Sequence, residues 1–219
     1  MRKSVFIFVA TVILLGYTAG ARAGVDFRGE ASLMSFWGYD ISVDYIVTQT
    51  PPSFESTAFS FGVGNAALYS MSSYFYFYQL ENFIDSNIDL FSISLPGEAV
   101  LTAGFITGVD LDAAPFSHSV PFETESMTAS IVNPDGCYDN VGGMMYSLNW
   151  WFDPEMAYDT ESTVLFITST DGPVFRYASA QNGDSFIGNV PAPDVPAVPE
   201  PGAMLLFLSG IIVYLKSRR

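Results

Sequence analysis

Alternating hydrophobicity indicates an all-β protein: an antiparallel β-sandwich of the jelly-roll type, with an N-terminal signal peptide and a short hydrophobic helix at the C-terminus. Three observations support this class. Apolar residues of the central region recur with a period of two, turn sequences interrupt them at short intervals, and no central segment sustains the 3.6-residue period of a helix. With 49% hydrophobic and 16% aromatic residues in 219, the chain is too apolar to be disordered.

The first strands follow directly from this alternation. It is clear in Ile41–Thr48, Phe59–Val63 and Phe105–Leu111. Residues Tyr74–Tyr78 read Tyr-Phe-Tyr-Phe-Tyr, so a strand there places the tyrosines on one face and the phenylalanines on the other. We expect the phenylalanines to face the core.

The later strands repeat the pattern. A change of phase near Leu90 predicts a β-bulge, and Tyr146–Phe152 alternates with Asn149 and Trp151 on the opposite side. Met127–Ile131 predicts a short strand, and Val164–Thr168 a continuously buried one. The total is about ten to twelve strands, which is typical of a sandwich.

Turn chemistry separates these strands. Gly, Pro, Asn and Asp gather at residues 51–52, 96–97, 133–136, 142–143, 171–173 and 182–184. A single helical turn is expected at Asn82–Ser86. Because crossover helices are missing from the pattern, an antiparallel arrangement is favoured over a parallel one.

The N-terminus has the three parts of a secretory signal peptide. Arg2 and Lys3 are basic, an apolar stretch runs from Val5 to Leu15, and Ala21-Arg22-Ala23 is a small-x-small cleavage sequence. We predict cleavage after Ala23, so that the mature chain begins at Gly24.

The C-terminus has its own pattern. Pro199-Glu200-Pro201 precedes an apolar run from Ala203 to Leu215 and a basic end formed by Lys216, Arg218 and Arg219. As a helix the apolar run reaches roughly 20 Å, against a hydrocarbon core of about 30 Å. Such a segment suits a transient membrane anchor, and the basic residues would hold its end in the cytoplasm.

Together, the motif, short helix and basic end resemble the PEP-CTERM sorting signal of Gram-negative bacteria that make extracellular polysaccharide. The resemblance covers only the last twenty-two residues or so of the chain. It implies processing by a membrane protease-transpeptidase called exosortase, with Pro199, Glu200 and Pro201 as the sorting motif. A plain C-terminal anchor after a proline-rich stalk is the alternative.

The resulting organisation has four parts: a signal peptide (1–23), an exported β-sandwich domain (24–190), a proline-rich stalk with the motif (191–201) and the sorting helix with its basic tail (202–219). Between Gly24 and Pro199 the chain has twenty-two acids but only Arg28 and Arg176 as basic residues, which gives a net charge of −20. This charge disfavours binding to nucleic acid and to anionic lipid.

Residues for catalysis are few. His118 is the only histidine and Cys137 the only cysteine, so a nucleophile with its base would require one or both. We expect His118 in a solvated loop and Cys137 as a free thiol. Carboxylates near Tyr146–Phe152 could suit a glycoside hydrolase, but acids are too frequent in this chain for their proximity to be specific.

Calcium is the metal that the acid-rich turns would suit best. Asp110 and Asp112, and the loop from Asp135 to Asp139, supply oxygen ligands, although neither follows the EF-hand order. Solvated acids are the favoured interpretation, and no cofactor is predicted.

We therefore expect a non-enzymatic protein with a structural or adhesive role at the cell surface or in the extracellular matrix. Its partners would be signal peptidase, an exosortase-like protease and extracellular polysaccharide, with a transient membrane contact through the C-terminal segment. The first alternative is a carbohydrate-binding module, with or without calcium, that presents Trp150 and Trp151 to sugar rings. A glycoside hydrolase is the third.

Overall fold

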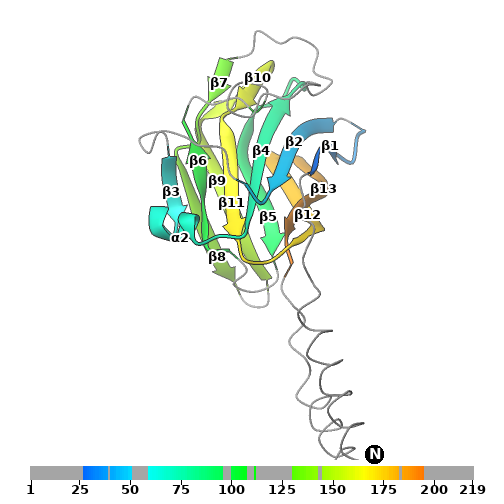
Figure 1. The fold of residues 1–219 in the computed structure, drawn as a ribbon. Coiled ribbons are helices and arrows are strands. Elements are labelled where there is room, and N and C mark those ends of the chain that lie inside the picture. The colour runs from blue at the N-terminus through cyan, green and yellow to red at the C-terminus, as the bar shows by residue number, and fades with distance from the viewer. Residues whose placement is uncertain are drawn as a thin grey trace, which may run out of the picture.

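The computed structural model describes residues 27–38, 40–50, 59–95, 100–107, 111, 130–142, 145–182 and 184–194. These residues form thirteen strands and one short helix (Figure 1). The elements are β1 (Phe27–Met34), β2 (Asp40–Thr48), β3 (Phe59–Val63), α2 (Ala66–Ser70), β4 (Tyr74–Asn82), β5 (Ile88–Leu95), β6 (Thr102–Ile106), β7 (Ser130–Val132), β8 (Gly136–Gly142), β9 (Met145–Met156), β10 (Thr160–Ser162), β11 (Val164–Ser169), β12 (Pro173–Asn182) and β13 (Asp184–Pro193).

The thirteen strands form one sheet, which confirms the predicted all-β class. Their order is β3-β6-β11-β4-β2-β1-β13-β12-β5-β9-β8, with β10 beside β4 and β7 beside β10. The ladders are antiparallel, except that β7 and β10 run parallel. The sheet rolls up until its end strands meet, since Gly62 of β3 lies against the backbone of Cys137 in β8. The sheet is therefore nearly closed.

The main core lies between the two halves of the rolled sheet. In Figure 1, β4 and β11 lie in front of β5 and β9. Trp150 of β9 donates its indole N–H to the Gly104 carbonyl of β6 at 2.8 Å, and its ring centroid is 6.5 Å from that of Tyr78 in β4. Leu, Ile, Val and aromatic side chains from both halves are fully buried in this space. Burial of this apolar surface is the main source of stability.

The tyrosines of β4 face this main core, and the prediction that its phenylalanines would do so was wrong. Tyr74, Tyr76 and Tyr78 lie among the main core residues, while Phe75 and Phe77 lie in a second cluster on the outer side of the sheet. Both faces of β4 are buried, so its alternation separates two clusters rather than core from solvent. Tyrosine is tolerated inside because its hydroxyl finds partners: the Tyr78 hydroxyl donates to the Pro191 carbonyl at 2.6 Å.

Helix α2 packs on the second cluster, which we call the outer aromatic cluster. Asn65 caps the helix, since its side chain accepts from the backbone N–H groups of Ala67 and Leu68. Tyr69 then reaches Phe59, Phe75 and Phe166 with ring centroids 5.0 to 5.8 Å apart in edge-on contacts. A five-residue helix is thereby held in place by aromatic packing rather than by its own propensity.

Two local predictions have opposite outcomes. The β5–β9 register shifts between Ile88 and Leu90, which confirms the bulge. The helical turn at Asn82–Ser86 was wrong, because Asn82 ends β4 and its side chain directs the chain into a bend. Its amide donates to three backbone carbonyls, and its side-chain oxygen accepts from the Ile84 N–H.

Pro191 and Pro193, expected at the start of the stalk, lie within β13. They pair with Phe175 and Pro173 of β12. On its other side, β13 pairs with β1 only through Ile187, opposite Met34. Among the described residues no strand pairs with positions 191 and 193 on that side, so the missing N–H groups of the two prolines break no ladder there. Proline is tolerated at such an edge.

Candidate functional site

Several predicted site residues lie outside the described residues. They comprise the sorting motif, the membrane stop, the signal cleavage site, His118 and two of the acids considered for calcium: Pro199, Glu200 and Pro201; Lys216, Arg218 and Arg219; Ala21, Ala23 and Gly24; Asp110 and Asp112. Predictions about these residues stay predictions.

The two tryptophans of the predicted sugar platform lie on opposite faces of β9. Trp150 is fully buried, whereas Trp151 is 42% exposed. The Trp150 ring stacks on Phe91 with centroids 5.6 Å apart, and its N–H is used by the Gly104 carbonyl. Trp150 is a core residue that cannot reach a ligand, so only Trp151 is available for stacking.

Cys137 is free but buried in the main core. Burial raises the pKa of its thiol far above the ordinary value, and the negative charge of Asp139 adds to the effect. Since the thiolate is the nucleophilic form, this shift disfavours Cys137 as a nucleophile at neutral pH.

The acids near β9 are not gathered into one site, because Glu155 and Glu161 have different hydrogen-bond partners. Glu155 accepts from the Asn87 amide at 2.8 Å, and Glu161 accepts from the Gln79 amide at 3.2 Å. Asp159 sits in a turn with a positive φ of 61°. Within the described ranges, no three His, Cys, Asp or Glu side chains are grouped so as to hold a metal ion.

Outer positions of the β13-β12-β5-β9-β8 half form a surface without charge, which we call the neutral face. Paired rows cross the strands: Ile187 with Ser179, Ser179 with Ser92, Ser92 with Asn149, and Asn149 with Tyr138. The neutral face consists of Ser185, Ile187 and Asn189; Tyr177, Ser179 and Gln181; Leu90, Ser92 and Ser94; Ser147, Asn149 and Trp151; Tyr138 and Asn140.

Three aromatic side chains of the neutral face are exposed to solvent. Trp151, Tyr138 and Tyr177 are 42%, 44% and 48% exposed. Between them the polar groups are already ordered, because the Ser92 hydroxyl donates to the Asn149 side-chain oxygen at 2.7 Å. Charged residues border the neutral face at its Trp151 end, where Asp153 and Glu155 continue the exposed side of β9 and Asp89 lies in the β5 bulge beside Leu90.

A groove of about 430 Å³ extends from one side of this face. It is lined by the tip of the β1–β2 hairpin and by two residues of β13: Met34, Ser35, Phe36, Trp37, Ser185 and Ile187. Phe36 and Trp37 are 92% and 71% exposed, and their rings meet edge to face at 5.3 Å. The lining contains no charged side chain, and its volume falls in the range of small-molecule sites.

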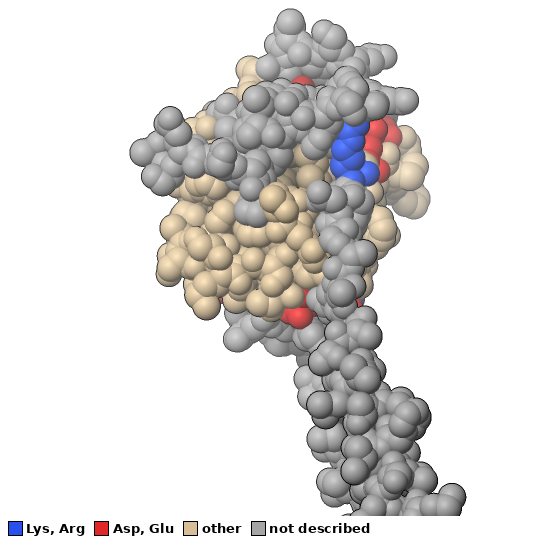
Figure 2. All heavy atoms as spheres, in the orientation of Figure 1, with Lys and Arg blue, Asp and Glu red and all other residues tan. Residues whose placement is uncertain are grey.

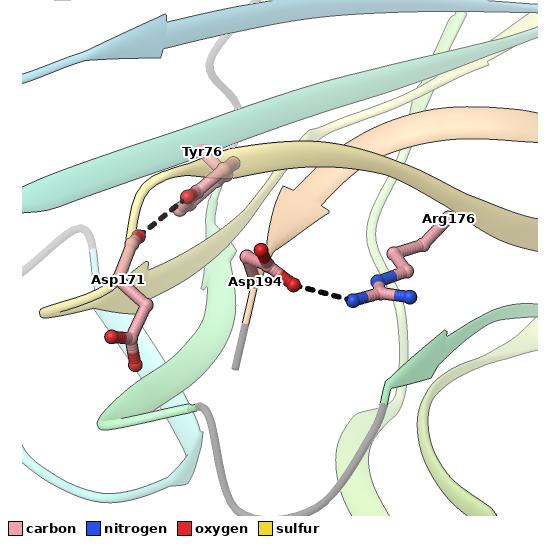
Figure 3. Close-up of polar contacts among 4 residues, drawn as sticks. All are labelled: Tyr76, Asp171, Arg176 and Asp194. Atoms are coloured by element: carbon pink, nitrogen blue, oxygen red, sulfur yellow. Dashed lines mark hydrogen bonds and ion pairs between the residues drawn. The ribbon is translucent and has the colours of Figure 1, made fainter. Parts of the chain in front are cut away.

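The last described residue is fixed to the sheet. An oxygen of the Asp194 carboxylate accepts from the Arg176 guanidinium at 2.6 Å (Figure 3). The Asp194 backbone N–H donates to the Gly172 carbonyl at 2.8 Å. Beside this pair, the Tyr76 hydroxyl donates to the Asp171 carbonyl at 2.8 Å (Figure 3). These contacts fix the C-terminal end of β13 to the turn between β11 and β12.

Charges are unevenly spread over the described surface. On the face seen in Figure 2 most described atoms belong to uncharged residues, and a basic patch meets acidic ones at one side. The one helix of the described ranges has five residues, well short of a membrane span. Comparison of the chain with protein-family models, with curated proteins and with solved structures found no match in any of the three.

Proposed function

We propose that this chain is an exported protein of the bacterial cell surface or extracellular polysaccharide matrix, with a structural or adhesive role and no catalysis. The C-terminal sequence carries the proposal. Pro199-Glu200-Pro201, a short apolar run and a basic end resemble the PEP-CTERM signal of exosortase substrates. The precursor would be held in the inner membrane of a Gram-negative cell until an exosortase-like protease acts on its tail.

The chemistry of the described domain supports a role without catalysis. Cys137 is buried with its thiol protonated, and Glu155 and Glu161 accept from two different side-chain amides, those of Asn87 and Gln79. A nearly closed, aromatic-rich sheet instead offers rigid surfaces, which suit adhesion. We infer that this rolled sheet is a β-sandwich of the jelly-roll type.

The intact mass of the protein tests the proposal. In cells that make the sorting protease, the wild-type chain should lose residues 1–23 and part of its tail. A variant with Pro199→Ala, Glu200→Ala and Pro201→Ala should lose only the signal peptide and stay in the membrane fraction.

Pro196→Ala is the matched control, because it removes a proline from the same stalk and leaves the motif intact. It should be processed like the wild type. Normal processing and localisation of the triple variant would refute the proposal.

A further inference from the structure

We propose that the neutral face binds a neutral, extended polysaccharide through Trp151, Tyr138 and Tyr177. This inference rests on the proposed function, because it names the matrix component to which the domain would adhere. It uses neither Trp150, which is buried, nor calcium.

The absence of charge is the first argument. The region between Gly24 and Pro199 has a net charge of −20, yet the neutral face, which draws on five neighbouring strands, consists only of Ser, Asn, Gln, Tyr, Trp, Leu and Ile. An acidic domain repels anionic polymers and anionic lipid. A surface that combines hydroxyl and amide groups with aromatic rings matches the hydroxyl groups and C–H faces of neutral sugars.

The arrangement of the rings is the second argument. From strand and residue spacings, Trp151 and Tyr138 are roughly 8 Å apart along the sheet, and Trp151 and Tyr177 roughly 16 Å. Each ring is about half exposed and stands on a rigid strand. The negative face of an aromatic ring attracts the polarised C–H groups of a sugar ring, so spaced rings suit successive units of one polymer.

Order among the polar groups is the third argument. Asn149 lies between Ser92 and Tyr138 in one row and is 6% exposed. Its side-chain oxygen accepts from Ser92, and its amide donates to Ser147 at 3.3 Å. Because these groups are held before any ligand arrives, binding would order few side chains.

The groove beside β13 extends the same surface. Ser185 and Ile187 belong both to the neutral face and to the groove lined by Phe36 and Trp37. A polymer that crosses the strands would meet uncharged residues from the hairpin tip to β8. Five strand spacings separate β1 from β8, about 24 Å.

Affinity electrophoresis of the full chain in a neutral detergent tests the inference. Native gels would contain hydroxyethylcellulose, galactomannan or dextran as neutral polymers, and alginate as an anionic one. At least one neutral polymer should retard the protein and alginate should not. Trp151→Ala and Tyr177→Ala should each weaken binding about tenfold, the usual effect of removing a central aromatic contact.

Two further variants keep the test independent of folding. Tyr158→Ala removes a tyrosine that is 58% exposed in the β9–β10 turn, outside the neutral face, and should bind like the wild type. Ser179→Asp removes no ring but places a negative charge in the middle of the face, and it should abolish binding. Circular dichroism and melting temperatures would confirm that the variants fold.

The possible outcomes separate this inference from the proposed function. Equal retardation by alginate, loss of binding in Tyr158→Ala, or full binding in Trp151→Ala and Ser179→Asp would overturn the inference. The inference would also be overturned if no neutral polymer retarded the protein and the protein instead bound phosphatidylcholine vesicles or associated with itself. Since the gels use purified protein, a failure of tail processing in cells would leave these results unaffected.

Discussion

Tyr78→Phe is the sharpest test of the assignment of the β4 tyrosines to the main core. Tyr78 is fully buried, and its hydroxyl donates to the Pro191 carbonyl at 2.6 Å, joining β4 to β13 across 113 positions of sequence. Burial also raises the pKa of this hydroxyl well above its ordinary value, so it stays a protonated donor. The substitution removes the donor with almost no change in side-chain volume.

The substitution should lower the free energy of unfolding because the buried Pro191 carbonyl loses the Tyr78 hydroxyl as a hydrogen-bond donor. A buried acceptor without its partner costs about 1 to 3 kcal/mol in the free energy of unfolding. For a domain of this size, each kcal/mol corresponds to about 2 to 4 °C in Tm, so we expect Tm to fall by roughly 2 to 12 °C.

Urea unfolding of the full chain in neutral detergent, followed by tryptophan fluorescence, gives the free energy, and calorimetry gives Tm. Tyr158→Phe is the matched control, since its side chain is exposed and its hydroxyl can bond to water. A Tyr78→Phe protein as stable as Tyr158→Phe would refute the argument that this hydrogen bond joins the two halves of the sheet.

Three further predictions concern other contacts. Gly62→Ala should destabilise the fold by about 1 to 3 kcal/mol, because a Cβ would overlap the Cys137 carbonyl, whereas Gly136→Ala, with open space around it, should have a much smaller effect in urea unfolding. Arg176→Ala should cost less than about 1 kcal/mol, since its ion pair with Asp194 is partly exposed, and the loss should shrink at high salt. Cys137 should resist iodoacetamide at pH 8 in the folded protein and react in urea, as measured by mass; native alkylation would contradict its burial.

Period-two alternation could predict strands such as β2 and β9 because each has one consistent face toward the main core. The bulge at Leu90 and the buried strand Val164–Thr168 were predictable from the same signal. The alternation could not predict which face of β4 lies toward the main core, because both faces are buried and only long-range packing decides which cluster each side chain joins. Asn65 before Ala66-Ala67-Leu68 was a visible cap signal, but α2 is too short to show a helical period.

The neutral face could not be predicted because it depends on register and strand order. Ser179, Ser92, Asn149 and Tyr138 come from four strands that are distant in sequence, and only pairing brings them into one row. The same holds for Trp150 and Trp151, since adjacent residues of a strand point to opposite faces and only the fold decides which face is outside.

The meeting of β3 with β8 has a consequence for how copies of this protein could assemble. An open sheet presents unpaired backbone groups at its edges, and these are templates for end-to-end strand addition and fibre growth. With Gly62 seated against Cys137, the β3 and β8 edges of this sheet shield each other, and the peripheral strand β7 has only three residues. The β13 edge pairs with β1 only at Ile187, but Pro191 and Pro193 lack the N–H donors that an added strand would need. At high concentration, copies of this domain are therefore poorly suited to joining edge to edge into amyloid-like filaments.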